Sequence, residues 1–178
     1  MTIFPFSLFP KLESTRLVLR QVMLSDANAI FRLRSNSSVN KYIDRKLCTS
    51  IDEARSFIEN VTKYFQEGKA IYWGIHLKTD DTIIGCIAFY NISETDHKGE
   101  IGYELMPEHQ GKGVMKEALN AALNFAFDSL SIKKIEANVH PQNNASLQLL
   151  LKLGFKLDQE KSKHQPELAL ECIRINTL

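Results

Sequence analysis

The chain has 178 residues, the length of one ordinary domain. Hydrophobic residues make up 44% and charged residues 24%, which is typical of a globular protein and excludes a disordered, collagen-like or coiled-coil chain. Lys and Arg number 22 against 21 Asp and Glu, so the net charge of +1 provides no broad field for nucleic acid or an anionic membrane. We therefore expect one domain over residues 1–178 with neither of these partners.

The cysteine pattern and the amino terminus favour a cytoplasmic protein. Cys48, Cys86 and Cys172 are widely separated and suggest neither a disulfide framework nor a metal site. The five histidines also lack metal-ligand spacing, so we expect no bound metal. Residues 1–10 are apolar but contain two prolines and no basic head, which makes a poor signal peptide, and no apolar run reaches the ~20 residues of a membrane span.

Alternating charged and apolar residues predict a first strand over residues 16–20. Ser25 and Asp26 are then expected to cap a helix that carries the apolar residues of 27–33. A loop is predicted at residues 36–38.

The next helix is predicted by a capping box, formed by Ser50 and Glu53. Apolar residues recur at helical spacing over residues 51–65, and Gly68 ends the helix.

The rest of the chain reads as strands and two further helices. The turn residues 79–81 indicate a hairpin between the first two strands. The helices are expected to begin at Val114 and Asn143, and the second ends at Gly154. The predicted strands are residues 72–77, 82–90, 100–106, 134–139, 156–160 and 168–176. This order predicts an α/β domain with a mixed sheet.

The segment from Glu100 to Met115 carries the clearest functional signal, because a strand, a short glycine-containing loop and a helix start follow one another. Such a turn directs free backbone N–H groups and the positive end of a helix dipole to one place, which suits a phosphate. Gly111 and Gly113 allow the backbone to approach the anion closely. The Walker ending and the three-glycine dinucleotide fingerprint are absent, so an ordinary strand-to-helix turn remains the alternative.

The residues Gln110-Gly111-Lys112-Gly113 resemble the pyrophosphate-binding loop of the GNAT superfamily of N-acetyltransferases. Six segments occur in the order found in the Rim-type branch, which contains bacterial ribosomal-protein N-terminal acetyltransferases; they are residues 16–20, 84–87, 100–103, 111–118, 143–146 and 152–155. The resemblance spans about residues 12–176. It implies a GNAT fold, in which a twisted, mostly antiparallel sheet has helices on both faces and is splayed between strands 100–106 and 134–139.

The resemblance also implies acetyl-CoA as co-substrate, bound in the splay without a metal. Pantetheine would pair with the backbone of Leu105 and Met106, and pyrophosphate would lie on the amides of residues 111–115. Lys112 is expected to contact a phosphate in part. The implied binding residues are Leu105, Met106, Gln110, Gly111, Lys112, Gly113, Val114, Met115, Asn143 and Ser146.

Two catalytic residues are implied. Glu100 matches the strand position that carries the general base in several relatives, and Glu104, a water chain or a merely solvated glutamate are the alternatives. Ser146 is expected near the CoA sulfur, while Asn143 would cap its helix and bind the pantetheine arm. Leu150 stands where many GNAT members carry a tyrosine acid, so that role cannot be carried over.

The expected reaction is direct attack of a primary amine on acetyl-CoA, with the N-terminal α-amine of a ribosomal or other protein as the preferred acceptor. A small amine such as a polyamine, amino acid or aminoglycoside is the alternative, and a non-catalytic acyl-CoA-binding module is a third. The loops at residues 36–47 and 160–167 carry no motif that identifies the acceptor. Residues 4–6 could serve packing or a partner contact, and a homodimer stays open.

Overall fold

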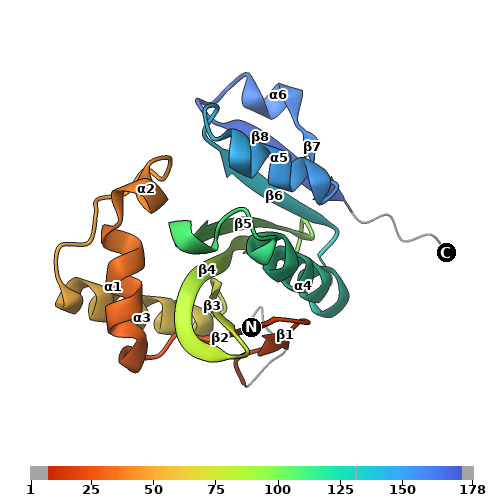
Figure 1. Ribbon diagram of the computed structural model, residues 1–178. Coiled ribbons are helices and arrows are strands. Elements are labelled where there is room, and N and C mark those ends of the chain that lie inside the picture. Colours follow the sequence, from red (N-terminus) through yellow and green to blue (C-terminus); the bar gives the residue numbers. More distant parts are fainter. Residues whose placement is uncertain (1–7, 131, 174–178) are drawn as a thin grey trace.

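The protein is described here by a computed structural model that covers residues 8–130 and 132–173. One sheet of eight strands forms its centre, in the order β1-β2-β3-β4-β5-β6-β8-β7 (Figure 1). Neighbouring strands are antiparallel except for the parallel pair β5 and β6. The strands are β1 (Leu12–Glu13), β2 (Leu17–Gln21), β3 (Ile71–Leu77), β4 (Asp80–Ser93), β5 (Lys98–Leu105), β6 (Lys134–Val139), β7 (Lys156–Leu157) and β8 (Leu168–Ile173).

Helices cover both faces of this sheet, as the family resemblance implied. In β3, Trp73 and Ile75 are fully buried in the cluster that contains residues of α4, whereas Tyr72 packs with the cluster that contains residues of α1 and α3. Successive side chains of a strand point to opposite faces, so α4 lies on one face and α1 with α3 on the other. The helices are α1 (Ala27–Ser35), α2 (Ser37–Asn40), α3 (Ile51–Gln66), α4 (Val114–Ser129), α5 (Asn144–Lys152) and α6 (Gln159–Ser162).

The sheet divides between β5 and β6, which confirms the predicted splay. These two strands pair only from Lys98 opposite Lys134 to Glu100 opposite Glu136. Beyond that point β5 stays with β4 as far as Leu105, while β6 stays with β8. Backbone groups on the β6 side of β5 therefore have no strand partner after residue 100, although such groups need hydrogen bonds.

The prediction of a loop at residues 36–38 is wrong, because a short helix, α2, begins at Ser37. Asn36 caps it: the side-chain oxygen of Asn36 accepts the backbone N–H groups of Ser38 and Val39. Asn is a favoured residue at this position, so a capping signal was interpreted as a turn.

The predicted strand over residues 156–160 is also mostly wrong. β7 consists of Lys156 and Leu157 only, and Asp158 then caps α6 by accepting the N–H of Lys161 at 2.9 Å. Residues 174–176 of the last predicted strand and the segment 4–6 lie outside the described residues.

The two predicted helix starts near residues 26 and 50 differ from the expectation in detail. Asp26 does not cap α1 through its side chain, since its carboxylate pairs with Arg20 instead. Ser50 does cap α3, accepting the N–H of Glu53 at 3.2 Å. The Glu53 carboxylate completes the turn by accepting the N–H of Thr49. No helix in the described ranges is long and apolar enough to cross a bilayer.

Candidate active site

The loop between β5 and α4, residues 110–113, is here called the glycine loop. Gly111 has φ +72° and Gly113 has φ +74°, a backbone conformation that residues with a side chain rarely adopt. Gly113 is the N-cap of α4 and has no side chain with which to bond the helix end. The first N–H groups of α4 are therefore left without a capping side chain.

The glycine loop is tied to the sheet at both ends. Arg16, just before β2, donates to the carbonyl of Lys112 at 3.2 Å and forms an ion pair with Glu117 of α4 at 2.7 Å. The side-chain amide of Gln110 donates to the carbonyl of Leu105 at 2.9 Å. These contacts turn the Glu117 carboxylate toward β2 and leave the positive end of the α4 dipole facing the loop.

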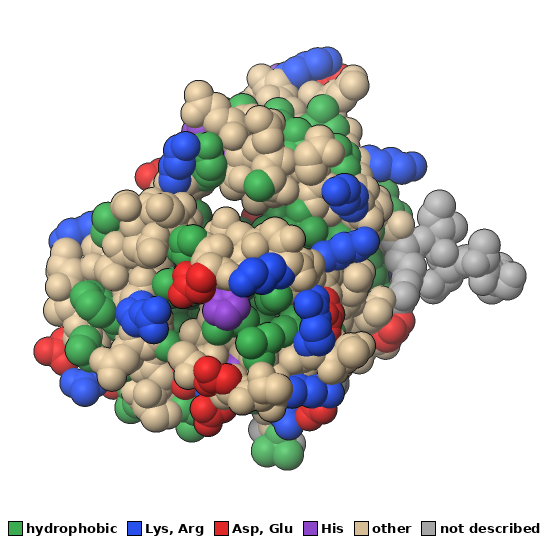
Figure 2. All heavy atoms as spheres, viewed as in Figure 1, with side chains coloured by type: hydrophobic (Ala, Val, Ile, Leu, Met, Phe, Trp, Pro, Cys, Tyr) green, Lys and Arg blue, Asp and Glu red, His purple; other side chains and the backbone are tan. Residues whose placement is uncertain are grey.

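A cavity of about 490 Å³, here called the glycine-loop cavity, lies between the glycine loop, the end of β5, α2 and α5. The space-filling view shows the surface hollowed in this region (Figure 2). Its size is in the usual range for small-molecule sites. Eight of the ten binding residues implied by the resemblance line it: Leu105, Gln110, Gly111, Gly113, Val114, Met115, Asn143 and Ser146.

Met106 and Lys112 are not brought to this cavity. The Met106 amide donates to Ile84 in the β4 ladder at 2.9 Å, and its carbonyl accepts the N–H of His109 at 3.0 Å. The structure therefore does not offer the Met106 amide to a ligand. Lys112 is exposed and does not line the cavity.

Cations reach the cavity from positions that the sequence pattern did not single out. Lys116 in the first turn of α4 and Lys152 at the end of α5 both line it. Both lysines lie in segments that carry the family resemblance, but no role was expected of them, because the two helices come together only in the folded chain.

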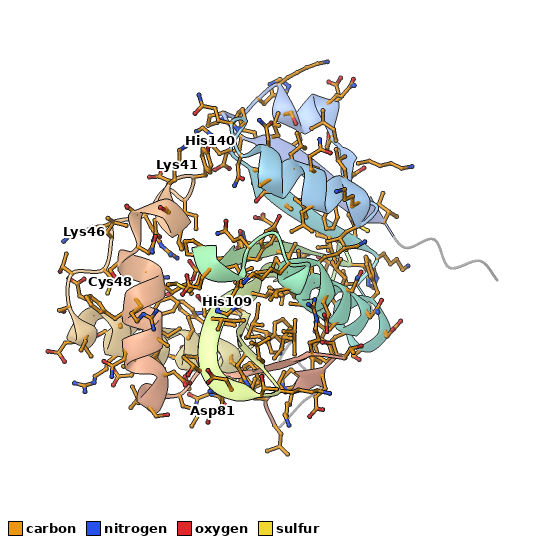
Figure 3. The ribbon with its side chains drawn as sticks, in the orientation of Figure 1. Lys41, Lys46, Cys48, Asp81, His109 and His140 are labelled. Atoms are coloured by element: carbon orange, nitrogen blue, oxygen red, sulfur yellow. The ribbon has the colours of Figure 1, made fainter. Side chains whose placement is uncertain are left out.

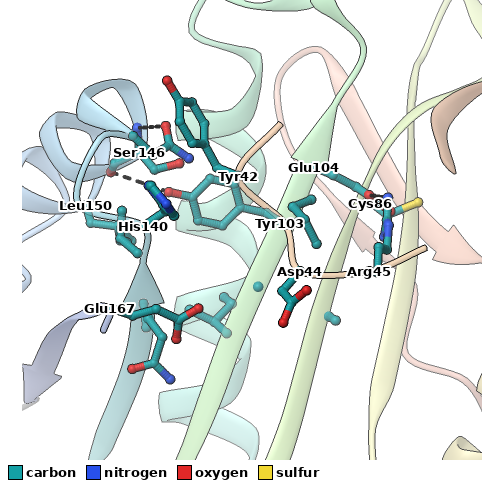
Figure 4. Close-up of a pocket in the computed structure, with 18 of the residues that line it drawn as sticks. Tyr42, Asp44, Arg45, Cys86, Tyr103, Glu104, His140, Ser146, Leu150 and Glu167 are labelled. Atoms are coloured by element: carbon teal, nitrogen blue, oxygen red, sulfur yellow. Dashed lines mark hydrogen bonds and ion pairs between the residues drawn. The ribbon is translucent and has the colours of Figure 1, made fainter. Parts of the chain in front are cut away.

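A second cavity, of about 310 Å³, is enclosed by β4, β5, β6 and the segment 42–45, and we call it the acidic cavity (Figure 4). It shares six lining residues with the glycine-loop cavity, and we call this shared zone the junction. The junction consists of Tyr42, Ile43, Tyr103, Glu104, Asn143 and Ser146. A group held in one cavity can therefore meet a group held in the other at the splay.

The segment after α2 forms part of the wall by bridging the two halves of the sheet. The ring of Tyr42 lies 5.2 Å, centroid to centroid, from the ring of His140 at the end of β6. Figure 3 labels Lys41, which precedes Tyr42 on one side of the split in the sheet, and His140 on the other side, with His109 at the turn that leads to the glycine loop.

Glu104, the alternative base, anchors the segment 42–45 to β5. Its side chain is 5% exposed and is paired with Arg45, which is 18% exposed. Tyr72 donates to the other carboxylate oxygen of Glu104 at 2.7 Å, and Arg45 donates to Asn40 at 2.5 Å. Both oxygens of Glu104 are thus occupied, and this geometry supports an anchoring role better than proton transfer.

Glu100, the predicted base, lines neither cavity. Its carboxylate accepts the side-chain amides of Asn91 at 3.2 Å and Asn138 at 3.3 Å. Asn138 does line the acidic cavity. Glu100 therefore lies behind the cavity wall, next to the lining residues Asn138 and Tyr90.

The carboxylates that face the acidic cavity without neutralisation are Asp44 and Glu167, which come from opposite sides of it. Neither has an ion-pair or side-chain hydrogen-bond partner among the described residues. Glu167 and Glu100 help burial to raise the pKa of Tyr90, so the field of these carboxylates reaches the cavity wall. Asp44 and Glu167 lie in the loops 36–47 and 160–167, where the sequence carries no motif that identifies the acceptor.

The start of α5 completes the junction. Asn143 accepts the backbone N–H of Ser146 at 3.2 Å, which confirms the predicted N-cap. Leu150 is fully buried and lines the acidic cavity. At this position, where many GNAT members carry a tyrosine acid, the chain therefore has an apolar wall. Groups of three or more His, Cys, Asp or Glu side chains that could hold a metal are not found in residues 8–130 and 132–173.

Comparison with known proteins agrees with this arrangement of fold and cavities. The acetyltransferase (GNAT) domain family matches residues 16–156, and the chain therefore belongs to the GNAT family of acetyltransferases. It is an acetyl-CoA-dependent N-acetyltransferase. Within the family it is close to the Rim-type ribosomal-protein acetyltransferases, both in sequence and in structure.

The individual matches differ in what their names say. The chain is 38% identical over 149 residues to the uncharacterized N-acetyltransferase YoaA of Bacillus subtilis (strain 168), covering 84% of each chain. It is 30% identical to the [ribosomal protein uS5]-alanine N-acetyltransferase of Escherichia coli (strain K12), covering 82% of this chain and 78% of the relative. It is 25% identical to the spermidine N(1)-acetyltransferase of Vibrio cholerae, covering 80% of each.

Among solved structures, the fold matches RimL, a ribosomal L7/L12 alpha-N-protein acetyltransferase in complex with coenzyme A. The TM-score is 0.80, the identity is 22%, and the match covers 92% of this chain and 98% of that one. At this identity the likeness shows the shared fold.

The glycine loop yields a prediction about cofactor binding. Gly111→Val should weaken acetyl-CoA binding by at least ~10-fold, because a β-branched side chain would stand between the backbone amides and an anion. Isothermal titration with acetyl-CoA measures this. Gly154→Val is the matched control: Gly154 also has positive φ and no atom within 4 Å of an added Cβ, but it lies outside both cavities. Equal loss of affinity in both variants would contradict the prediction.

The Glu104–Arg45 pair yields a prediction about stability. Glu104→Gln and Arg45→Met should each lower the free energy of unfolding by about 3 kcal/mol, since each leaves a poorly solvated charge without its partner. The double variant should lose clearly less than the sum of the two. Urea unfolding measures these values, with Asp52→Asn, which breaks an exposed pair with Arg55, as the control expected to change little. Strict additivity would show that the pair is not coupled.

Proposed function

We propose that this enzyme transfers the acetyl group of acetyl-CoA to the N-terminal α-amine of a protein. The observation that carries the proposal is the junction, where a cavity built for an anionic, elongated ligand meets a separate acidic cavity. Direct attack of an amine on a thioester needs two such sites that open onto one another, because bringing the reacting atoms together accounts for much of the rate.

On the donor side, the amides of residues 111–115 are the proposed pyrophosphate site. Two glycines in left-handed conformation and an uncapped helix start support it. Lys116 and Lys152 add positive charge at the same cavity. In the antiparallel β4–β5 ladder Met106 bonds to β4, so by alternation the N–H of Leu105 points toward the splay, where pantetheine or the developing oxyanion can accept it.

At the junction, Asn143 and Ser146 are proposed to contact the end of the pantetheine arm. Ser146 lies in the first turn of α5 and lines both cavities. We propose that its hydroxyl donates a hydrogen bond to the leaving sulfur, and the capping of this turn by Asn143 supports that role.

On the acceptor side, Asp44 and Glu167 make the acidic cavity attractive to a protonated amine. The amine must then lose a proton, and Glu100 is the proposed acceptor of that proton through a bridging water, while Asn138 holds its carboxylate in position. An α-amine demands little of this base. With a pKa near 8 about 10% of it is neutral at pH 7, compared with about 0.04% of a Lys side chain whose pKa is near 10.4.

The 30% identity to a uS5-alanine N-acetyltransferase supports a protein α-amine as the acceptor. A small cationic amine is the second candidate, because the acidic cavity is only about 310 Å³ and two unneutralised carboxylates face it. The 25% identity to a spermidine acetyltransferase adds to that candidate.

The acceptor proposal is tested with three substrates. A short peptide with a free α-amine and no Lys should be acetylated at least ~10-fold faster, by kcat/KM at pH 7, than the same peptide blocked at its N-terminus and containing one Lys, because the α-amine is far more often neutral. Release of free CoA thiol measures the rate, and the blocked peptide without Lys gives the background. Rapid turnover of spermidine with neither peptide acetylated would favour the second candidate.

The proposed proton route is tested by Glu100→Gln. This change should lower kcat/KM about 10- to 100-fold at pH 7, and the loss should shrink toward pH 9, where most of the acceptor α-amine is already neutral without a base. Affinity for acetyl-CoA should stay unchanged, since Glu100 lines neither cavity. Glu59→Gln on the exposed face of α3 is the control. A wild-type profile from pH 6 to 9 would remove Glu100 from the mechanism.

A further inference from the structure

The junction contains a hydroxyl group that the mechanism above does not use. Tyr103 of β5 lines both cavities, and its side chain lies on the face opposite to that of Glu104. Figure 4 shows the Tyr103 hydroxyl directed at the start of α5, whereas Glu104 turns away toward Arg45. Tyr103 therefore stands where the contents of the two cavities meet.

The Tyr103 hydroxyl is free to act as a donor. Its contact is the carbonyl of Ser146 at 3.5 Å, the far limit for a hydrogen bond. A buried hydroxyl normally makes a shorter bond, so this one is available to a stronger acceptor. By comparison, both oxygens of Glu104 are occupied, and the ring of Tyr42 packs at a tilt against His140.

The reaction requires a hydrogen-bond donor at the junction, where the sulfur of acetyl-CoA leaves. The amine nitrogen forms a bond to the thioester carbon, the C–S bond breaks, and its electron pair goes to sulfur. Once the ammonium proton has passed to Glu100, the neutral amine attacks and releases one further proton to solvent, and the departing thiolate finally gains one, so protons balance. Until that proton arrives the sulfur carries negative charge inside a partly buried site, where an uncompensated charge is costly. Leu150, one turn after Ser146, supplies only apolar surface.

We propose that Tyr103 is a catalytic residue that donates a hydrogen bond, together with Ser146, to the leaving sulfur of acetyl-CoA. Burial raises the pKa of Tyr103 to about 12, whereas a thiol has a pKa near 8.5. Tyr103 therefore keeps its own proton throughout the reaction and stabilises the thiolate as a neutral donor. The solvent-borne proton released by the amine completes the thiol.

Tyr103→Phe removes the hydroxyl and keeps the ring. It should lower kcat about 10- to 100-fold, the range expected for one hydrogen bond to a charged group, and leave the acetyl-CoA dissociation constant within about threefold of wild type. Tyr64→Phe on the exposed surface of α3 is the control. Loss of acetyl-CoA affinity in parallel with kcat, or retention of more than half of kcat, would overturn the proposal.

A second experiment needs no acceptor substrate and keeps the side chain of residue 103 a tyrosine, changed only by fluorination. Fluorotyrosine is placed at position 103, and its ¹⁹F resonance is titrated against pH with either CoA or desulfo-CoA, which lacks the thiol. If the hydroxyl contacts the sulfur, the thiolate of CoA should raise the pKa of the fluorinated phenol, since two adjacent negative charges repel each other, and desulfo-CoA should not. Equal titration with both ligands would place the sulfur elsewhere. Binding of neither ligand would overturn the donor-site assignment itself, which distinguishes the two failures.

Discussion

The site depends on one constraint of the sheet, which is that β5 and β6 are hydrogen-bonded at one end and separate at the other. A sheet interior normally leaves no backbone group without a partner, so a split in its middle must be filled by side chains, water or a ligand. Here the parallel pairing at residues 98–100 keeps the two halves together, while β5 continues with β4 and β6 with β8. The glycine-loop cavity and the acidic cavity meet along this split.

Although the whole chain is nearly neutral, positive and negative side chains are divided between the two cavities. The glycine-loop cavity has a helix start, Lys116 and Lys152, and the acidic cavity has Asp44 and Glu167. Glu104 lies between them and would add negative charge to both, but Arg45 neutralises it. Surfaces of opposite sign therefore lie next to one another in one small site, which fits the anionic donor and the cationic acceptor proposed above.

Strands line most of the acidic cavity, but its two carboxylates that are unpaired within the described residues come from loops. Asp44 lies in the segment after α2, which is held down by Arg45 and Asn40, and Glu167 precedes β8. The glycine loop, in contrast, is fixed to β2 by Arg16 and to β5 by Gln110. The proposed donor site is thus tied to the sheet, whereas the charged side chains of the proposed acceptor site lie on loops, which vary more readily than strands.

The sequence by itself determined most of the elements, the family and the glycine loop, because these depend on residues a few positions apart. The capping of α5 by Asn143 and the end of α3 at Gly68 are examples. Prediction failed where one residue type is common both in turns and at helix starts, as when Asn36, the cap of α2, was taken for part of a loop.

Only the tertiary structure decided which polar groups share the site. Arg45 and Glu104 are 59 residues apart, and Tyr103 meets Ser146 across 43 residues, so no local pattern could pair them. Packing of the loop after α2 and of α5 against the split sheet brings them together, and it leaves Glu100, the base expected from its position on the strand, behind Asn138.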